Sequence, residues 1–145
     1  MASPRSKARQ RALEILFEAD LRGVDPRVIL ADTLARIRAQ GPDGTIPQIQ
    51  DYARTLIEGV LEHVDRIDDA IDQHSDGWAL DRMPTVDRNV LRIGAYELLY
   101  QPDVPDAVVL DEAVSLVRLM STDDSPQFVN GLLARLAEVK ETLRR

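Results

Sequence analysis

Four basic residues, Arg5, Lys7, Arg9 and Arg11, fall within the first eleven positions, and no acidic residue separates them. Basic side chains at this density can neutralise several phosphates of a nucleic acid. The same composition is also typical of a solvated helix start, or of an arm that pairs with acids of a neighbouring helix. A basic first turn opposes the helix dipole, which mildly favours a binding role.

The charge of the whole chain contrasts with this arm. The 145 residues hold 18 basic and 25 acidic side chains, which gives a formal net charge of −7. The 14 basic residues outside the arm share the chain with all 25 acids, so the rest of the chain carries −11. A basic arm on an acidic body can bind a polyanion locally, while the body repels it elsewhere.

Two further pairs of residues suggest contact with a nucleic acid. Phe128, with Gln127 before it, lies in the first turn of a predicted helix, where an aromatic ring could stack on a base, although core packing is the more common use. Arg88 and Arg92 lie one turn apart on an otherwise apolar helix. Each of these arginines therefore needs a carboxylate, solvent or a phosphate.

The remaining polar groups form no recognisable catalytic or metal site. The chain has no cysteine, so it has no disulfide framework, thiolate metal site or cysteine nucleophile. His63 and His74 are the only histidines, and roughly 16 Å of helix separates them, too far to share a metal. The acids of residues 58–76 lack the glycine-containing loop of an EF-hand, so we expect a solvated face or a docking surface for a basic protein. Nucleotide-binding, hydrolase and metalloprotease motifs are absent, and we expect no enzyme, metal or cofactor.

Hydropathy gives no sign of a membrane segment. No apolar run approaches the roughly 18 residues that a spanning helix needs. No apolar segment follows the basic N-terminus, so we expect no signal peptide. Together with the lack of cysteine, these features favour a cytoplasmic protein.

Helical periodicity and cap residues predict the elements that position these side chains. The sequence predicts an all-α fold of about seven helices in a single domain over residues 1–145. Ser3–Pro4 and Asp25–Pro26 are helix starts, and Gly23 is a helix stop. We expect helices over residues 4–22, 26–39, 47–76 with a bend near 65, 87–100, 106–120 and 126–143.

The segment 87–100, DRNVLRIGAYELLY, is apolar nearly all round and is predicted to be the central helix. Gly94 costs roughly 1 kcal/mol against alanine within a helix, so we expect another backbone to approach it closely. Thr85 can cap this helix, and Trp78 is expected to plug the core. Asn130–Gly131 suggests a close helix crossing with a buried hydrogen bond.

Side chains of the two N-terminal helices can be assigned in the same way. Arg5 and Arg9 share one face of the first helix, and we expect both to lie outside the core. On the second helix, Val28 is expected to be buried together with Leu30, Leu34 and Ile37.

Three motifs resemble the NusB family of transcription antitermination factors. They are DRNVLRIGAYEL (87–98), VPDAVVLDEAVSLVR (104–118) and DDSPQFVNGLL (123–133), in that order and spacing. The segment ARQRALEILFEADL (8–21) resembles the first helix of that family. The resemblance covers nearly the whole chain.

The resemblance implies two packed helical subdomains and binding to the single-stranded boxA segment of RNA. It also implies a partner, the small-subunit ribosomal protein NusE, and entry into RNA polymerase elongation complexes. The RNA contacts that it implies, by position, are Arg5, Lys7, Arg9, Arg92, Gln127 and Phe128. The acids that it implies near the partner are Asp81, Asp87 and Asp124.

The chain departs from the family pattern at two positions. Ser6 interrupts the opening basic run, and Phe17 stands where many members have tyrosine. The same fold occurs as the N-terminal domain of ribosomal RNA cytosine methyltransferases, but the chain ends at Arg145 without an S-adenosylmethionine-binding domain, so we expect no methyltransferase. The rival hypothesis is a helical scaffold that binds no RNA and forms a homodimer through its N-terminal arm.

Overall fold

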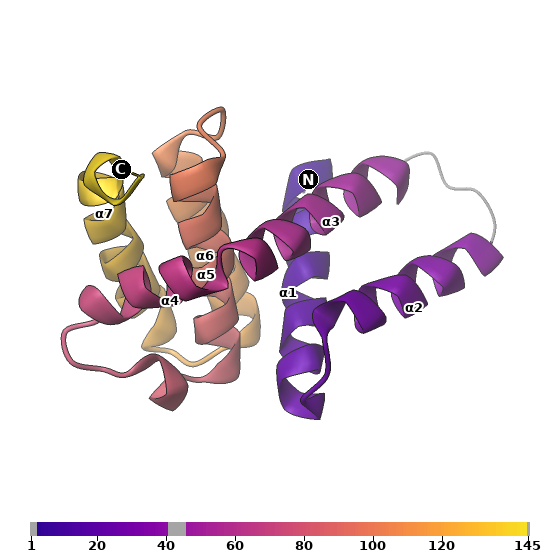
Figure 1. Cartoon of the computed structure of the whole chain (residues 1–145), viewed down its shortest axis with the longest axis horizontal. Helices are drawn as coiled ribbons and strands as arrows, with labels where there is room; N and C mark the ends of the chain where they lie inside the picture. The colour runs from indigo at the N-terminus through magenta and orange to yellow at the C-terminus, as the bar shows by residue number, and fades with distance from the viewer. Residues whose placement is uncertain (1–2, 41–45, 145) are drawn as a thin grey trace. The chain divides into compact units, whose positions relative to one another are not determined.

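The computed structural model describes residues 3–40 and 46–144 (Figure 1). Over these ranges the chain forms helices and no strand, so the prediction of an all-α fold is confirmed. None of these helices combines the length and apolarity that a bilayer crossing requires. The elements are α1 (Pro4–Arg22), α2 (Pro26–Ala39), α3 (Ile46–Glu62), α4 (Val64–Gln73), the 3-10 turn η1 (Leu80–Arg82), α5 (Thr85–Tyr100), α6 (Asp106–Met120) and α7 (Ser125–Arg144).

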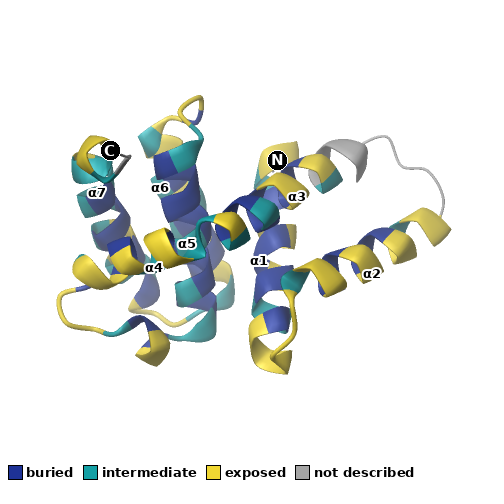
Figure 2. Cartoon of the chain, viewed as in Figure 1, coloured by how far each residue is buried: buried dark blue, intermediate teal, exposed yellow. Residues whose placement is uncertain are grey.

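The chain divides into two compact units, residues 1–59 and 60–145, and the division falls inside α3. Each unit has its own set of buried residues (Figure 2). The single domain over residues 1–145 stays a prediction.

In the first unit, local signals set the bounds of α1 and α2. The Ser3 hydroxyl accepts a hydrogen bond from the Ser6 backbone N–H at 3.1 Å, and Pro4 follows as the first helical residue. Gly23 ends α1 in the left-handed conformation, with φ of 66°. The Asp25 carboxylate accepts from the Arg27 N–H at 2.9 Å and starts α2. These starts and stops confirm the sequence prediction.

The core of the first unit forms where α1 packs on α2 and where α3 adds a third apolar face. Its buried side chains include Ala8, Ala12, Leu13, Ile15 and Leu16 of α1, Ile29, Leu30 and Leu34 of α2, and Ala53, Leu56 and Ile57 of α3. Val28 was predicted to be buried and is 54% exposed. The buried stripe of α2 instead includes Ile29 and Thr33, whose hydroxyl donates to the Ile29 carbonyl at 2.9 Å.

The second unit is built around α5, which packs against α4, α6 and α7. Figure 1 shows α5, α6 and α7 side by side. From Val86 to Leu99, every residue except Arg88 and Arg92 is buried, which confirms the predicted central helix.

Gly94 lies where α5 meets α7. A Cβ added at Gly94 would lie 2.8 Å from Cδ1 of Leu133, a side chain on α7. The expected close approach is therefore present, but a side chain makes it rather than a backbone. Thr85 does not cap α5, since Pro84 occupies the cap position and no side chain caps the helix.

The predicted bend in the long helical segment is a break at His63, between α3 and α4. The His63 ring stacks on the Tyr100 ring, with centroids 3.9 Å apart and planes 14° apart. His63 is thus a partly buried residue at a helix junction.

Two predictions about the interior of the second unit are wrong. Trp78 is 39% exposed and does not plug the core, because the connector between α4 and α5 runs along the surface of the unit. Asn130 is exposed, so the predicted buried hydrogen bond at Asn130–Gly131 is absent. A Cβ at Gly131 would meet the Arg135 side chain at an ordinary 3.6 Å.

Candidate nucleic-acid interface

The basic arm is divided between exposed and buried side chains. Arg5, Lys7 and Arg11 are exposed, whereas Arg9 is 3% exposed. The expectation that Arg9 lies outside the core is therefore wrong. Arg9 follows Ala8 on the covered face of α1 and lies one turn before the fully buried Leu13, so the packing of α1 encloses it.

A tyrosine on α3 positions the guanidinium groups of the arm. Cζ of Arg5 lies 4.3 Å from the centroid of the Tyr52 ring, and Cζ of Arg9 lies 5.6 Å from the same centroid. Tyr52 is itself only 9% exposed. Cations over a ring face are attracted to its quadrupole, at about 0.5–1 kcal/mol for exposed pairs and about 2 when desolvated. Sequence reasoning did not identify this role of Tyr52.

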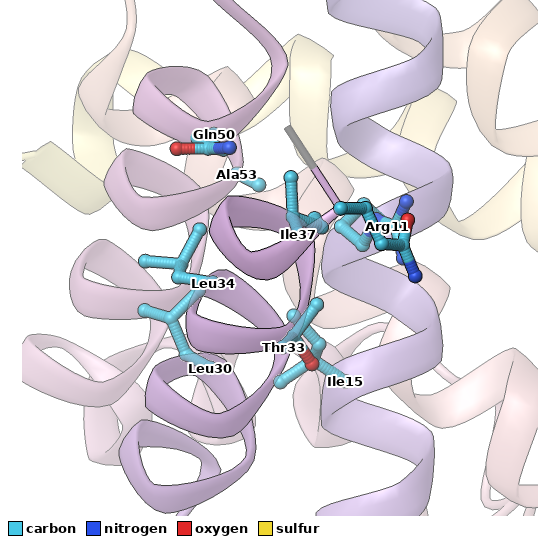
Figure 3. Close-up of a pocket in the computed structure, with 9 residues that line it drawn as sticks. Arg11, Ile15, Leu30, Thr33, Leu34, Ile37, Gln50 and Ala53 are labelled. Carbon is cyan, nitrogen blue, oxygen red and sulfur yellow. The ribbon is translucent and has the colours of Figure 1, made fainter. Parts of the chain in front are cut away.

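Arg11 borders a hollow of about 120 Å³ among α1, α2 and α3 (Figure 3). Figure 3 shows Ile15 of α1 beside Thr33 of α2, with Arg11 beside Ile37. The residues that line it are Arg11, Ile15, Leu30, Thr33, Leu34, Ile37, Gln40, Gln50 and Ala53. Most of these residues are apolar, and Arg11 is the single charged one. One cation beside an apolar lining does not make an anion site, so the hollow is a packing gap.

In the second unit, a carboxylate pairs with Arg92. Nε and Nη2 of Arg92 donate to the two carboxylate oxygens of Asp68 on α4, at 2.9 and 3.0 Å. Nη1 donates to the Asn89 side-chain oxygen at 3.3 Å, and the Arg92 side chain is 17% exposed. A two-bond pair of this kind is strong and directional. The RNA contact of Arg92 stays a prediction, and the paired Asp68 carboxylate weakens the attraction of Arg92 for a phosphate.

The three acids predicted to face a protein partner differ in exposure. Asp81 in η1 and Asp124 in the α6–α7 loop are exposed. Asp87 is 1% exposed, so the prediction that it faces the partner is corrected, because a buried carboxylate is no part of a docking surface. Its oxygens accept hydrogen bonds from the Ser121 hydroxyl at 2.5 Å and the Ser125 hydroxyl at 2.8 Å. Asp87 therefore joins the start of α5 to the start of α7.

At the start of α7, an aromatic pair faces outward. The Phe128 ring packs against the Trp78 ring, with centroids 4.7 Å apart and planes inclined by 60°. Phe128 is half-buried, and Gln127 beside it is exposed. Phe128 is thus accessible at the position where the sequence predicted a base contact. Sequence reasoning expected Trp78 in the core and so did not predict its contact with Phe128 at the surface.

A second, open hollow of about 530 Å³ lies between α6 and α7 and is bordered by Gln127. It is lined by Asp111, Val114, Arg118, Asp123, Pro126, Gln127 and Asn130. Its charged residues are one arginine and two aspartates, so the hollow is not selective for anions. Within the ranges that the structure covers, no cluster of three or more metal-ligating side chains occurs.

The chain was compared with known proteins. The sequence model of the NusB family matches residues 6–138. The transcription antitermination protein NusB of Streptomyces avermitilis is 55% identical over 141 residues, which cover 97% of this chain and 96% of that protein. NusB of Kineococcus radiotolerans is also 55% identical, over 96% of each chain.

Solved structures agree with these sequence relatives. A structure of T. maritima NusB is 36% identical, with a TM-score of 0.81, and covers 95% of this chain and 93% of that chain. A crystal structure of the antitermination factors NusB and NusE in complex with dsRNA contains a chain that is 27% identical, with a TM-score of 0.81, over 96% of this chain and 99% of that one. The resemblance that the three motifs indicated is confirmed over nearly the whole length, and the chain belongs to the NusB family.

Proposed function

We propose that this chain is a transcription antitermination factor that binds single-stranded boxA RNA together with NusE. It joins the RNA polymerase elongation complex and supports transcription of ribosomal RNA. The observation that carries this proposal is the full-length match to a chain in the complex of NusB, NusE and RNA, over 96% of this chain at a TM-score of 0.81. A match that omits no helix supports a shared mode of binding.

The arm supports the phosphate part of the proposal. Arg5 and Lys7 are exposed at the start of α1, and the Tyr52 ring orients Arg5. Contacts of this kind attract RNA without reading its sequence, and they release counterions on binding.

The start of α7 supports the base-reading part. The exposed Gln127 carries an amide that can pair with base edges, and the half-buried Phe128 offers an aromatic ring for stacking. Bases in a duplex are already stacked and paired, so such contacts favour an unpaired strand. The related complex contains double-stranded RNA, so the test includes a duplex.

The exposed acids support the protein part. Asp81 and Asp124 offer negative charge to a ribosomal protein, a class that is generally basic. Complementary charge speeds encounter and suppresses wrong partners.

The test is a fluorescence anisotropy titration of labelled RNA at several salt concentrations, with and without purified NusE. The RNAs are a boxA-like strand, a scrambled strand of equal length and the boxA-like duplex. We expect the tightest binding for the boxA-like single strand with NusE present. Equal affinity for the scrambled strand would overturn the boxA assignment, and preference for the duplex would overturn the single-strand assignment.

Light scattering of the same samples tests the rival hypothesis. If the arm serves self-association, the protein is a dimer at micromolar concentration and stays one when RNA is added. If the arm binds RNA, boxA-like RNA with NusE yields a complex that contains one copy of the chain. Association with polymerase is then measured by co-migration with elongation complexes stalled downstream of boxA, using a scrambled boxA template as the control.

A further inference from the structure

Trp78 is a large apolar side chain at the surface, and the proposed function assigns it no role. It is the only tryptophan in the sequence and is 39% exposed. It follows Asp76 and Gly77, which adopt φ of 54° and 83°. A left-handed non-glycine residue is uncommon and costs conformational energy, which the surrounding structure must offset.

Hydrogen bonds hold the backbone on both sides of Trp78. Before it, Nε and Nη2 of Arg135 on α7 donate to the His74 carbonyl at 3.1 and 2.6 Å. After it, the Leu80 N–H donates to the Asp72 carboxylate at 3.0 Å. The Trp78 N–H itself donates to the Ser75 carbonyl at 3.2 Å. The connector is thus fixed while the side chain that it carries is exposed, which is the arrangement of a preorganised binding group.

The surroundings of Trp78 are polar. Its ring contacts Phe128, whose neighbour Gln127 is exposed, and the connector continues through the exposed Asp81 and Arg82. A protein interface is typically centred on a contiguous apolar patch of several hundred Å². A nucleotide needs less, namely one aromatic surface for the base and nearby polar groups for its edges.

We propose that Trp78 and Phe128 together form a stacking platform for one unpaired base of the bound RNA. This inference rests on the proposed function, and it extends the predicted base contact of Phe128 to a second residue and a second element. Gln127, beside Phe128, supplies an amide for the base edge. The occupant is a nucleobase rather than a protein side chain, because the exposed polar residues Gln127, Asp81 and Arg82 adjoin the two rings along the chain.

The first experiment uses the intrinsic fluorescence of Trp78 in the unmodified protein. With NusE present, a ring that stacks on a base is quenched and is shielded from acrylamide. A NusE preparation without tryptophan, or a difference measurement against NusE alone, isolates the Trp78 signal. We expect quenching by boxA-like RNA to saturate at the same RNA concentration as the anisotropy signal.

The second experiment measures the affinity of variants. Base–aromatic stacking corresponds to about a 5- to 150-fold change in dissociation constant, so Trp78→Leu should weaken boxA-like RNA binding within that range. Trp78→Phe should retain most of the affinity. Leu119→Ala, which alters a 69% exposed apolar residue of the same unit, is the matched control and should bind as the parent does. Melting curves establish that each variant is folded.

The outcomes separate this inference from the proposed function. If no RNA binds in the anisotropy experiment, the proposed function fails. If RNA binds but Trp78 is neither quenched nor shielded, and Trp78→Leu binds as tightly as the parent, only the platform is overturned. If NusE alone produces the full shielding and RNA adds nothing, Trp78 belongs to the protein interface and the platform is likewise overturned.

Discussion

The two units differ in whether their charged or their aromatic side chains are exposed at the proposed RNA contacts. In the first unit, Arg5 and Lys7 are exposed and the aromatic ring that orients Arg5, Tyr52, is 9% exposed. In the second unit, Arg92 is held by Asp68 and the Trp78 ring is 39% exposed. At the proposed RNA contacts, the first unit therefore presents the cations Arg5 and Lys7 to solvent, and the second presents the rings of Trp78 and Phe128, although Arg82 and Arg118 of the second unit are exposed as well.

This contrast suggests a division of work in RNA binding. Exposed cations contact phosphates, so their contribution falls steeply with salt and is indifferent to sequence. Exposed rings contact bases, so their contribution depends little on salt and can discriminate between sequences. The two contributions are separable in one titration series. Four variants, two of them double, test the contrast.

Phe128→Ala is expected to have the largest effect. Removing the ring takes away about 1–3 kcal/mol of stacking, which is about 5- to 150-fold in affinity for boxA-like RNA. The loss should be smaller for scrambled RNA, while the slope of log affinity against log salt stays unchanged. Anisotropy titrations of both RNAs at several salt concentrations measure this. A changed slope with intact discrimination would reverse the roles assigned to the two units.

Gly94→Leu tests the packing of the interior of the second unit, whereas the other variants change its surface or that of the first unit. The added side chain must displace Leu133 and should lower the free energy of unfolding by roughly 1–3 kcal/mol. Chemical denaturation followed by circular dichroism measures the change. Gly23→Ala is not a suitable control, because Gly23 itself has a positive φ. A neutral or raised stability would mean that the α5–α7 contact is looser than described.

Arg5→Ala with Lys7→Ala tests the cations of the first unit. For single strands each lost phosphate contact should reduce the salt slope by about 0.7, so the pair should reduce it by about 1.4. The loss should be similar for boxA-like and scrambled RNA. Arg9 is left intact because its burial would mix binding with stability.

The matched control for that pair is Arg22→Ala with Arg36→Ala. Both arginines are exposed residues of the first unit, and their removal changes the net charge equally. We expect the control to keep the parental slope. If both double variants change the slope alike, the arm acts through overall charge and makes no localised contacts.

Asp81→Lys with Asp124→Lys is expected to have the smallest effect. Exposed ion pairs contribute about 0.2–1 kcal/mol each, so NusE binding should weaken a few-fold, mostly through a slower association rate. RNA binding without NusE should not decrease. Calorimetry and stopped-flow mixing measure the two quantities, and unchanged NusE affinity at low salt would exclude both acids from the partner surface.

Much of the helical framework could be predicted because its signals are local. Ser3–Pro4 and Gly23 bound α1 through contacts within a few residues, and the apolar run of α5 predicts its burial without knowledge of its neighbours. The family resemblance rested on motifs along the chain, so it too required no tertiary information.

The burial and the partners of individual polar and aromatic side chains could not be predicted in the same way. Asp87 is held by Ser121 and Ser125, which lie 34 and 38 positions away. Arg92 meets Asp68 from 24 positions away. These pairings depend on which helices pack together, and periodicity within one helix does not specify that. Trp78 was expected to plug the core, whereas the tethered connector holds it at the surface.

The contact between Gly94 and Leu133 also restricts relative motion of the helices. Leu133 fills the space above a residue without a side chain, and the flanking positions on that face of α5 carry larger groups. Sliding α7 along α5 by one turn would place Leu133 against Leu91 or Leu98 instead of glycine. The register between the two helices is thereby locked, and the first turn of α7, with Gln127 and Phe128, keeps a constant orientation to α5. RNA that binds there meets a surface whose geometry exists before it arrives, so little ordering entropy is lost on binding.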